Sequence, residues 1–173
     1  AWALDAARRT LLADLLTHGL AEFAHVNGLD LTDWFELAPA VTAPLVLSDP
    51  PPLTSGPLVP VGGGKDSIVT LEALRSQSPT LFAVNPKGPI ERTFDVAGMP
   101  VVRVQRALDE RLFDLNDRGA FNGHVPVTAI VSAAAIVSAV LGGHHTVAMS
   151  NEASADQPTL FTSDGRAVNH QWS

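Results

Sequence analysis

A short apolar run leads into three consecutive glycines and then into a helical pattern at residues 59–71, where the sequence reads Val-Pro-Val-Gly-Gly-Gly-Lys-Asp-Ser-Ile-Val-Thr-Leu. Because glycine lacks a Cβ atom, the backbone at Gly62–Gly64 can bend sharply and approach a ligand closely. The N–H groups of such a loop and the positive end of the helix behind it form a site for phosphate. This segment therefore predicts a strand, a phosphate-binding turn and a helix in direct succession.

Two common nucleotide-binding patterns match this segment only in part. The Walker A pattern requires Ser or Thr after Gly64-Lys65, where Asp66 stands, and a glycine at the position of Val59. The dinucleotide fingerprint Gly-x-Gly-x-x-Gly lacks its third glycine, because Ser67 occupies that position. A glycine turn that joins a strand to a helix without any ligand is the remaining alternative.

Apolar runs of strand length alternate with helical patterns from residue 58 onward. The predicted strands are Leu58–Val61, Thr80–Val84, Val101–Val104 and Thr146–Met149. The predicted helices are Asp66–Ser76, Glu91–Ala97, Leu108–Leu115 and Val125–Leu141. The last helix is apolar nearly all round, which predicts that it is buried. The alternation predicts an α/β fold with a three-layer arrangement around a parallel sheet and right-handed crossovers.

The part of the chain before residue 58 has a different pattern. Residues 3–25 show helical periodicity, with a possible interruption at Gly19. Residues 27–58 contain many prolines and are typical of an irregular connection. We therefore expect residues 1–57 to form an N-terminal helix and a proline-rich connection, and residues 58–173 to form a nucleotide-binding domain.

Composition narrows the classes of function. A chain of 173 residues can form a full core, and its net charge of −7 argues against nucleic-acid binding, which needs a basic surface. The sequence has no cysteine, which excludes disulfides, thiolate zinc sites and a persulfide-carrying cysteine within this chain. It has no apolar run long enough to span a membrane and no secretory signal pattern, so we expect a cytoplasmic protein without a membrane partner. Because it starts without Met, we also expect a fragment.

Ligands of parallel α/β sheets bind outside the carboxyl ends of the strands. In this sequence a polar or glycine-rich cluster follows each predicted strand. These clusters are Gly62–Ser67, Asn85–Lys87, Gln105–Arg106 and Ser150–Glu152. Because the carboxyl ends of parallel strands meet at one edge of a sheet, we expect the clusters to share a single ligand-binding edge.

Lys65, Asp66 and Ser67 open the helix after the glycines. An acid in a first helical turn is ordinary helix-dipole chemistry. Beside a triphosphate, however, Asp66 would help to hold Mg²⁺, because phosphates and one or two carboxylates commonly share that ion. Ser67 can donate a hydrogen bond to a phosphate oxygen.

Three histidines flank the long helix. His124 precedes it in the run Asn122–Pro126, where it either caps the helix or, at the sheet edge, binds substrate phosphate or moves a proton. His144 and His145 follow the helix and are interpreted as structural, because a histidine near a helix C-terminus complements the dipole.

The glycine loop resembles the pyrophosphate-binding loop of the PP-loop ATPases, usually written Ser-Gly-Gly-x-Asp-Ser, with Gly62 where that family normally has Ser. Members of that family split ATP into AMP and pyrophosphate, generally to adenylate a substrate. The resemblance implies a HUP-like architecture of the adenine nucleotide alpha hydrolase-like kind, with ATP and Mg²⁺ as cofactors.

Four segments together resemble the UDP-N-acetyl-alpha-D-muramoyl-L-alanyl-L-glutamate epimerases of bacterial peptidoglycan synthesis. They are Gly62–Ser67, Asn122–Pro126, Ser150–Ser154 and Val168–Ser173. Members of this family are considerably longer, so the resemblance also implies that the chain lacks parts on both sides of its nucleotide domain.

The resemblance implies an isomerase that inverts the terminal L-glutamate of the small-molecule substrate UDP-MurNAc-L-Ala-L-Glu at the expense of ATP. Adenylation removes the charge of the glutamate carboxylate, which makes the neighbouring α-proton removable. The residues implied to bind ATP are Gly62, Gly63, Gly64, Lys65, Asp66, Ser67, Asn85, Ser150 and Asn151. Asp66 and Glu152 are implied to lie near Mg²⁺, and the candidate catalytic groups are His124, His170 and Glu152.

Two alternatives remain open at this point. The first is another PP-loop adenylating enzyme, such as an amide ligase or a tRNA-modifying ATPase, although the acidic charge and the absence of cysteine argue against work on tRNA. The second is a nucleotide-binding module without catalytic activity. The oligomeric state is left open by the sequence.

Overall fold

The computed structural model describes residues 4–31, 34–35, 37, 49, 51–151, 157–165 and 167–168. The chain divides into two compact units, each assembled from separate segments. The first unit comprises residues 1–49, 109–130 and 153–173, and the second comprises residues 50–108 and 131–152. The predicted division between residues 57 and 58 stays a prediction.

A parallel sheet forms the centre of the second unit. Its strands β1 (Leu58–Pro60), β2 (Thr80–Val84) and β3 (Val101–Val104) lie in the order β1-β2-β3. Residues 146–148 run parallel to β1 on its other side, because Leu58 N donates to Thr146 O (2.8 Å) and Ala148 N donates to Leu58 O (2.9 Å). The predicted strands therefore occupy neighbouring positions in one sheet, the last of them only as a single bridge.

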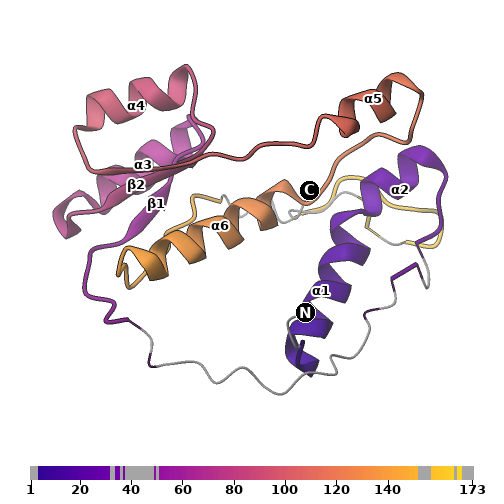
Figure 1. Ribbon diagram of the computed structural model, residues 1–173, viewed down its shortest axis with the longest axis horizontal. Coiled ribbons are helices and arrows are strands. Elements are labelled where there is room, and N and C mark those ends of the chain that lie inside the picture. Colours follow the sequence, from indigo (N-terminus) through magenta and orange to yellow (C-terminus); the bar gives the residue numbers. More distant parts are fainter. Residues whose placement is uncertain are drawn as a thin grey trace. The chain divides into compact units, whose positions relative to one another are not determined.

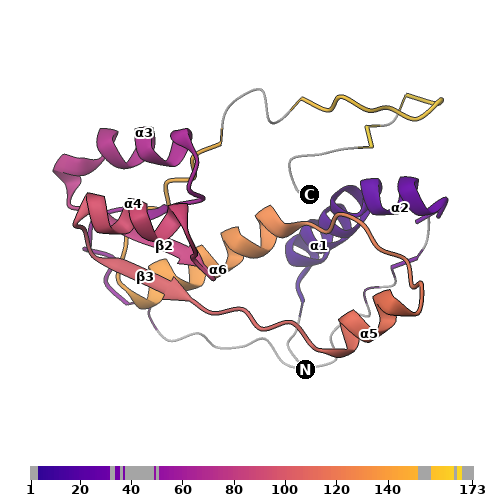
Figure 2. The ribbon, with the colours of Figure 1, turned by 90° about the horizontal axis from the view of Figure 1, so that it is seen from above.

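Helices cover both faces of this sheet (Figures 1 and 2). On one face, α3 (Lys65–Ala73) and α4 (Pro89–Ala97) contribute Leu71 and Phe94 to a core that includes Leu81 of β2. On the other face, α6 (Val127–Leu141) packs its alanines over Phe82. Successive strand residues point to opposite faces, so Leu81 and Phe82 enter different cores. The predicted α/β fold with a parallel sheet is confirmed.

Helix ends differ from the predictions where local chemistry shifts them. α4 begins at Pro89, ahead of the predicted start, because proline suits the first helical position. α5 (Arg111–Asp117) begins later than predicted, since Asp109 Oδ1 accepts a hydrogen bond from Arg111 N (3.0 Å). The predicted helix Asp66–Ser76 is divided into α3 and the 3-10 helix η1 (Arg75–Gln77).

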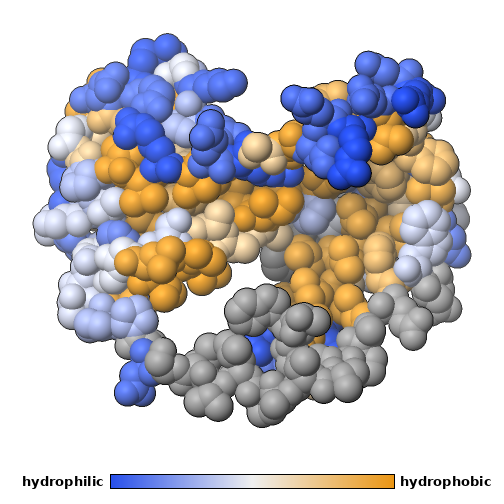
Figure 3. All heavy atoms as spheres, in the orientation of Figure 1, coloured by the Kyte–Doolittle hydropathy of each residue, from blue (hydrophilic) through white to orange (hydrophobic). Residues whose placement is uncertain are grey.

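The prediction that the long helix is buried is wrong for much of its surface. Within α6 only Ala135 and Ala139 are buried, whereas Ile136, Val137 and Leu141 are 57%, 58% and 83% exposed. Hydrophobic surface accordingly gathers over α6 on the face seen in Figure 3. The small alanines allow close approach to the sheet and Val131 packs beside them, whereas Ile136, Val137 and Leu141 are exposed. Nearly uniform hydrophobicity thus identified the helix but not the extent of its burial.

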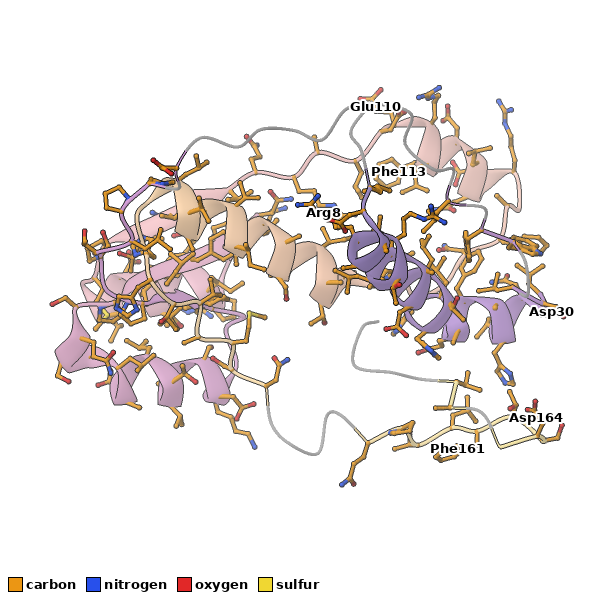
Figure 4. All side chains as sticks on the ribbon, turned by 90° about the horizontal axis from the view of Figure 1, so that it is seen from below. Arg8, Asp30, Glu110, Phe113, Phe161 and Asp164 are labelled. Atoms are coloured by element: carbon orange, nitrogen blue, oxygen red, sulfur yellow. The ribbon has the colours of Figure 1, made fainter. Side chains whose placement is uncertain are left out.

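The first unit contains α1 (Ala6–Gly19), α2 (Ala21–Asn27) and α5. The single helix predicted over residues 3–25 is interrupted at Leu20, next to the suspected Gly19. Glycine is needed there because a Cβ atom on Gly19 would lie 2.7 Å from Pro126 Cβ. Figure 4 shows side chains of this unit, including Arg8 on α1 and Phe113 on α5. Within the part of the chain that the structure describes, no helix is both long and apolar enough to cross a membrane.

Candidate functional site

The glycine loop, Gly62–Gly64, connects β1 through Val61 to the start of α3. Val61 N donates to Phe82 O (2.8 Å), which holds the beginning of the loop against β2. Gly64 is the N-cap of α3, with φ −91° and ψ 171°, and no side chain caps the helix. Because the first N–H groups of a helix have no partner within it, α3 presents free donors and the positive end of its dipole beside the loop. This is the local arrangement that a phosphate group requires.

Only one of the three glycines is required by the backbone conformation. Gly63 has φ +80°, and a Cβ atom there would lie 3.0 Å from Ile90 Cγ1. At Gly62 and Gly64 the backbone is not left-handed, and a Cβ atom would meet nothing within 4 Å. A side chain at either position would extend into open space above the loop, which is the space that a ligand needs to reach the backbone.

We therefore expect alanine substitutions to separate the conformational role from the binding role. Gly63→Ala should lower the free energy of unfolding by about 1–2 kcal/mol, because an L-residue is strained in the left-handed region. Gly62→Ala and Gly64→Ala should stay within about 0.5 kcal/mol of the unsubstituted protein. Urea unfolding followed by circular dichroism measures this difference. Equal costs at the three positions would contradict the assigned loop conformation.

The residues after the loop have distinct surroundings. Ser67 is buried and its Oγ donates to Gly64 O (2.9 Å), so in this structure the hydroxyl stabilises the loop itself. Asp66 is half-buried in the first turn of α3, and Lys65 is exposed. The phosphate contact predicted for Ser67 and the role of Lys65 stay predictions.

The glycine loop lies at a reversal of strand order. The chain passes from β1 to β2 and β3 on one side of β1, whereas residues 146–148 lie on the other side. Such a switch point, at the carboxyl ends of the strands, is where open α/β sheets bind ligands. Gly62–Gly64 follow β1 and Ser150-Asn151 follow residues 146–148, so both loops flank the switch point. Their adjacency follows from the parallel pairing of the strands that precede them.

Ser150 provides an independent sign of a missing partner. Its Oγ is buried and, among the described residues, has no hydrogen-bond partner. Leaving a buried hydroxyl without a partner costs about 1–3 kcal/mol. A ligand oxygen at the switch point would satisfy it, and the participation of Ser150 in nucleotide binding stays a prediction. The contact predicted for the neighbouring Asn151 is not tested by any described interaction.

Of the two residues predicted to lie near Mg²⁺, the structure describes Asp66 but not Glu152. Those residues contain no group of three or more His, Asp or Glu side chains that could hold a metal ion. Mg²⁺ bound together with phosphates needs only one or two carboxylates, and Asp66 is one such group. Glu152 lies outside the described residues, so its predicted roles beside Mg²⁺ and in catalysis stay predictions.

Asn85 joins the ends of two strands. It has φ +48°, its N donates to Val104 O (2.8 Å), and its side-chain Nδ2 donates to Arg106 O (2.7 Å). In return, Arg106 N donates to Asn85 Oδ1 (2.8 Å). The amide of Asn85 therefore positions the segment after β3, and the direct nucleotide contact predicted for it stays a prediction.

The structure places the candidate histidines in different surroundings. His124 belongs to the first unit, where its Nδ1 lies 3.4 Å from Glu22 Oε2. His144 is buried with Nδ1 2.8 Å from Gly56 O, and His145 Nδ1 lies 2.7 Å from Thr146 Oγ1, which agrees with the structural interpretation of both. His170 lies outside the described residues. The catalytic roles of His124 and His170 stay predictions.

Sequence patterns did not reveal the charge balance at the ends of β2 and β3. Glu91 on α4 accepts hydrogen bonds from Arg103 on β3, at 2.8 Å from Nη2 to Oε2 and 3.1 Å from Nε to Oε1. These bonds hold the pKa of the Glu91 carboxyl below its ordinary value. The polar clusters Asn85–Lys87 and Gln105–Arg106 signalled this edge, but only the structure shows which charges are paired.

Comparisons with known proteins identify relatives of this chain. Three curated relatives carry the name UDP-N-acetyl-alpha-D-muramoyl-L-alanyl-L-glutamate epimerase. The relative from Salinispora tropica is 47% identical over 94% of this chain, that from a Micromonospora species 44% over 98%, and that from Xanthomonas oryzae pv. oryzae 39% over 99%. The chain spans only 36% to 38% of the length of these relatives. No solved structure matches the chain.

The family comparison covers the whole chain. The model of the MurL N-terminal domain matches residues 1–173, which include both units and the glycine loop. The family resemblance read from the sequence is thereby confirmed, and the chain belongs to the MurL N-terminal domain family.

Proposed function

We propose that this domain binds ATP and Mg²⁺ at the switch point and contributes to an ATP-dependent epimerase. The observation that carries the proposal is the open space above Gly62 and Gly64, where neither packing nor backbone conformation calls for glycine. The first N–H groups of α3 and the Ser150 hydroxyl, which has no hydrogen-bond partner among the described residues, belong to loops at the same edge of the sheet. These features fit the terminal phosphates of ATP, with Asp66 supplying a carboxylate for Mg²⁺.

The proposed reaction is inversion of the terminal L-glutamate of UDP-MurNAc-L-Ala-L-Glu to D-glutamate, in peptidoglycan precursor synthesis. The names of the three curated relatives and the membership of this chain in the MurL N-terminal domain family support it. We further propose that the sheet belongs to the PP-loop type of nucleotide-binding fold. The strand order supports this proposal, because the glycine loop follows β1 at the switch point. An ATP-dependent reaction of this kind fits a cytoplasmic location.

ATP supplies an activated phosphorus that converts the glutamate carboxylate into a mixed anhydride, in which the carboxyl group itself no longer carries a charge. A carboxylate oxygen forms a bond to the α-phosphorus as the bond to pyrophosphate breaks, and the N–H groups at Gly62–Ser67 hold the departing pyrophosphate. With the carboxylate charge removed, a base takes the α-proton and a second group returns a proton to the opposite face. Water then breaks the anhydride and releases AMP. His124, His170 and Glu152 are the proposed acid–base groups.

The test uses the protein at its full natural length with ATP, Mg²⁺ and UDP-MurNAc-L-Ala-L-Glu in D₂O. We expect AMP, pyrophosphate and D-glutamate to form together, because the carboxylate must be activated before the α-proton leaves. The inverted glutamate should carry deuterium at Cα, since the returned proton comes from solvent. Chromatography of the nucleotides and of the glutamate enantiomers after hydrolysis, followed by mass spectrometry, gives all of these quantities.

Different outcomes distinguish the alternatives. Formation of AMP only after addition of an amine, with an amide as product, would identify a ligase instead. Formation of AMP only with tRNA would identify a tRNA-modifying enzyme. ATP binding without turnover of any of these substrates would leave a nucleotide-binding module and would refute the epimerase proposal.

A further inference from the structure

A cleft of about 600 Å³ lies at the carboxyl ends of β2 and β3, and we call it the edge cleft. Its charged lining residues are Lys87, Glu91, Arg103 and Arg106. The edge cleft lies within the second unit, at the same edge of the parallel sheet as the glycine loop. Neither the family match nor the names of the relatives assign a ligand to it.

Two of the cations in the edge cleft are not neutralised by the described residues. Arg103 is paired with Glu91 through two hydrogen bonds, so these two charges cancel. Lys87 and Arg106, by contrast, form no ion pair within the described part of the chain. This local excess of positive charge stands out in a chain whose net charge is −7. It indicates a site for an anionic group.

The backbone that carries these cations is held in place. Asn85 exchanges two hydrogen bonds with the backbone of Arg106 and forms a third with Val104. The segment that carries Arg106 is therefore fixed beside the turn that carries Lys87. A fixed pair of cations suits a ligand with two adjacent negative charges better than it suits an isolated carboxylate.

The position of Arg106 argues against the phosphates of ATP as the ligand of the whole edge cleft. Neighbouring strands are about 4.8 Å apart, so β2 lies next to β1, whereas β3 and the Arg106 that follows it lie about 10 Å from β1 along the sheet edge. The turn with Lys87 is nearer to the glycine loop, since a Cβ atom on Gly63 would lie 3.0 Å from Ile90 Cγ1. When the triphosphate occupies Gly62–Gly64, the uncharged ribose and adenine give no reason for a cation at Arg106.

We propose that the edge cleft binds the diphosphate of the sugar-nucleotide substrate through Lys87 and Arg106. This inference rests on the proposed function, because it assigns one part of that substrate to this domain. The Arg106 guanidinium offers paired donors to phosphate oxygens, and the Lys87 ammonium adds a point charge. The glutamate end of the same substrate then extends toward the glycine loop, where activation takes place.

The test measures the binding of UDP and of a non-hydrolysable ATP analogue separately, by isothermal titration calorimetry of the full-length protein. The double variant Lys87→Ala/Arg106→Ala removes both cations, and Arg92→Ala is the matched control, because Arg92 is an exposed cation on α4 outside the edge cleft. We expect UDP to bind about 100-fold more weakly to the double variant, since each charge-assisted contact contributes about tenfold. Affinity for the ATP analogue, and both affinities of the control, should stay within about twofold.

The possible results separate this inference from the proposed function. Weaker binding of the ATP analogue with unchanged binding of UDP would assign the edge cleft to ATP and overturn the inference. Unchanged UDP binding in the double variant, or no UDP binding by the unsubstituted protein, would also overturn it. Failure of the proposed function gives a different result, namely no AMP from the unsubstituted protein with the complete substrate. Circular dichroism of each variant confirms that the exposed substitutions leave the fold intact.

Discussion

Asp66→Asn should reduce the formation of AMP and pyrophosphate at least about 100-fold, because a metal ion that neutralises developing phosphate charge contributes several kcal/mol to the transition state. The amide keeps the shape of the side chain but removes the charge that holds Mg²⁺. Asp66 is half-buried in the first turn of α3, next to the free N–H groups of the glycine loop. Steady-state assays of pyrophosphate release over a range of Mg²⁺ concentrations measure the effect, and the Mg²⁺ requirement should rise.

A second carboxylate on the same helix provides the control. Glu72 is exposed and pairs with Arg75, so Glu72→Gln should leave pyrophosphate release within about twofold. If Asp66 served only the helix dipole, Asp66→Asn would lower stability by at most about 1 kcal/mol and leave the rate nearly unchanged. Such a result would refute the assignment of Asp66 to Mg²⁺.

Phe82→Ala should destabilise the second unit by about 3–5 kcal/mol, the usual cost of removing a fully buried aromatic side chain. Phe82 lies on the central strand β2, is fully buried, and packs with Leu58 beneath Ala135 and Ala139 of α6. Since small domains are stable by only about 5–15 kcal/mol, this single change removes a large part of the margin. Urea unfolding at equilibrium, followed by circular dichroism, measures the change.

The matched control for this prediction lies on the surface of the same unit. Val96 on α4 is 88% exposed, so Val96→Ala should change the free energy of unfolding by less than about 0.5 kcal/mol. A cost below about 1 kcal/mol for Phe82→Ala would mean that α6 does not cover this face of the sheet.

Much of the second unit could be predicted from local patterns. The bounds of β2 and β3 agree with the predicted strands, because runs such as Thr-Leu-Phe-Ala-Val and Val-Val-Arg-Val combine β-branched residues with clear flanking breaks. The strand–glycine–helix order around Gly62–Gly64 was likewise readable, since glycine has a direct local effect on the backbone. Helix ends were less predictable, because proline at Pro89 and the side chain of Asp109 shift them by individual hydrogen bonds and torsion angles.

The placement of the polar clusters at one edge of the sheet could be predicted, but their contacts could not. The polar clusters after the strands identified the edge, because parallel strands bring their carboxyl ends together. The hydrogen bonds from Ser67 to Gly64 and from Asn85 to Arg106 could not be predicted from the sequence, since each depends on the positions of the two residues after folding. The same is true of the pair Glu91–Arg103, and of the absence of an ion pair at Lys87 and Arg106 among the described residues.

The sequence by itself determined the alternation of strands and helices, the glycine turn and the family, because each is written in residues close together along the chain. Only the tertiary structure decided that Gly63 is the one loop glycine required by conformation and that one side of α6 is exposed. It also decided that Ser150 Oγ is buried without a hydrogen-bond partner among the described residues. These properties depend on which surfaces meet in three dimensions. Hydrophobicity and residue type express a tendency to be buried or to bind, whereas the surrounding atoms determine whether a given side chain does so.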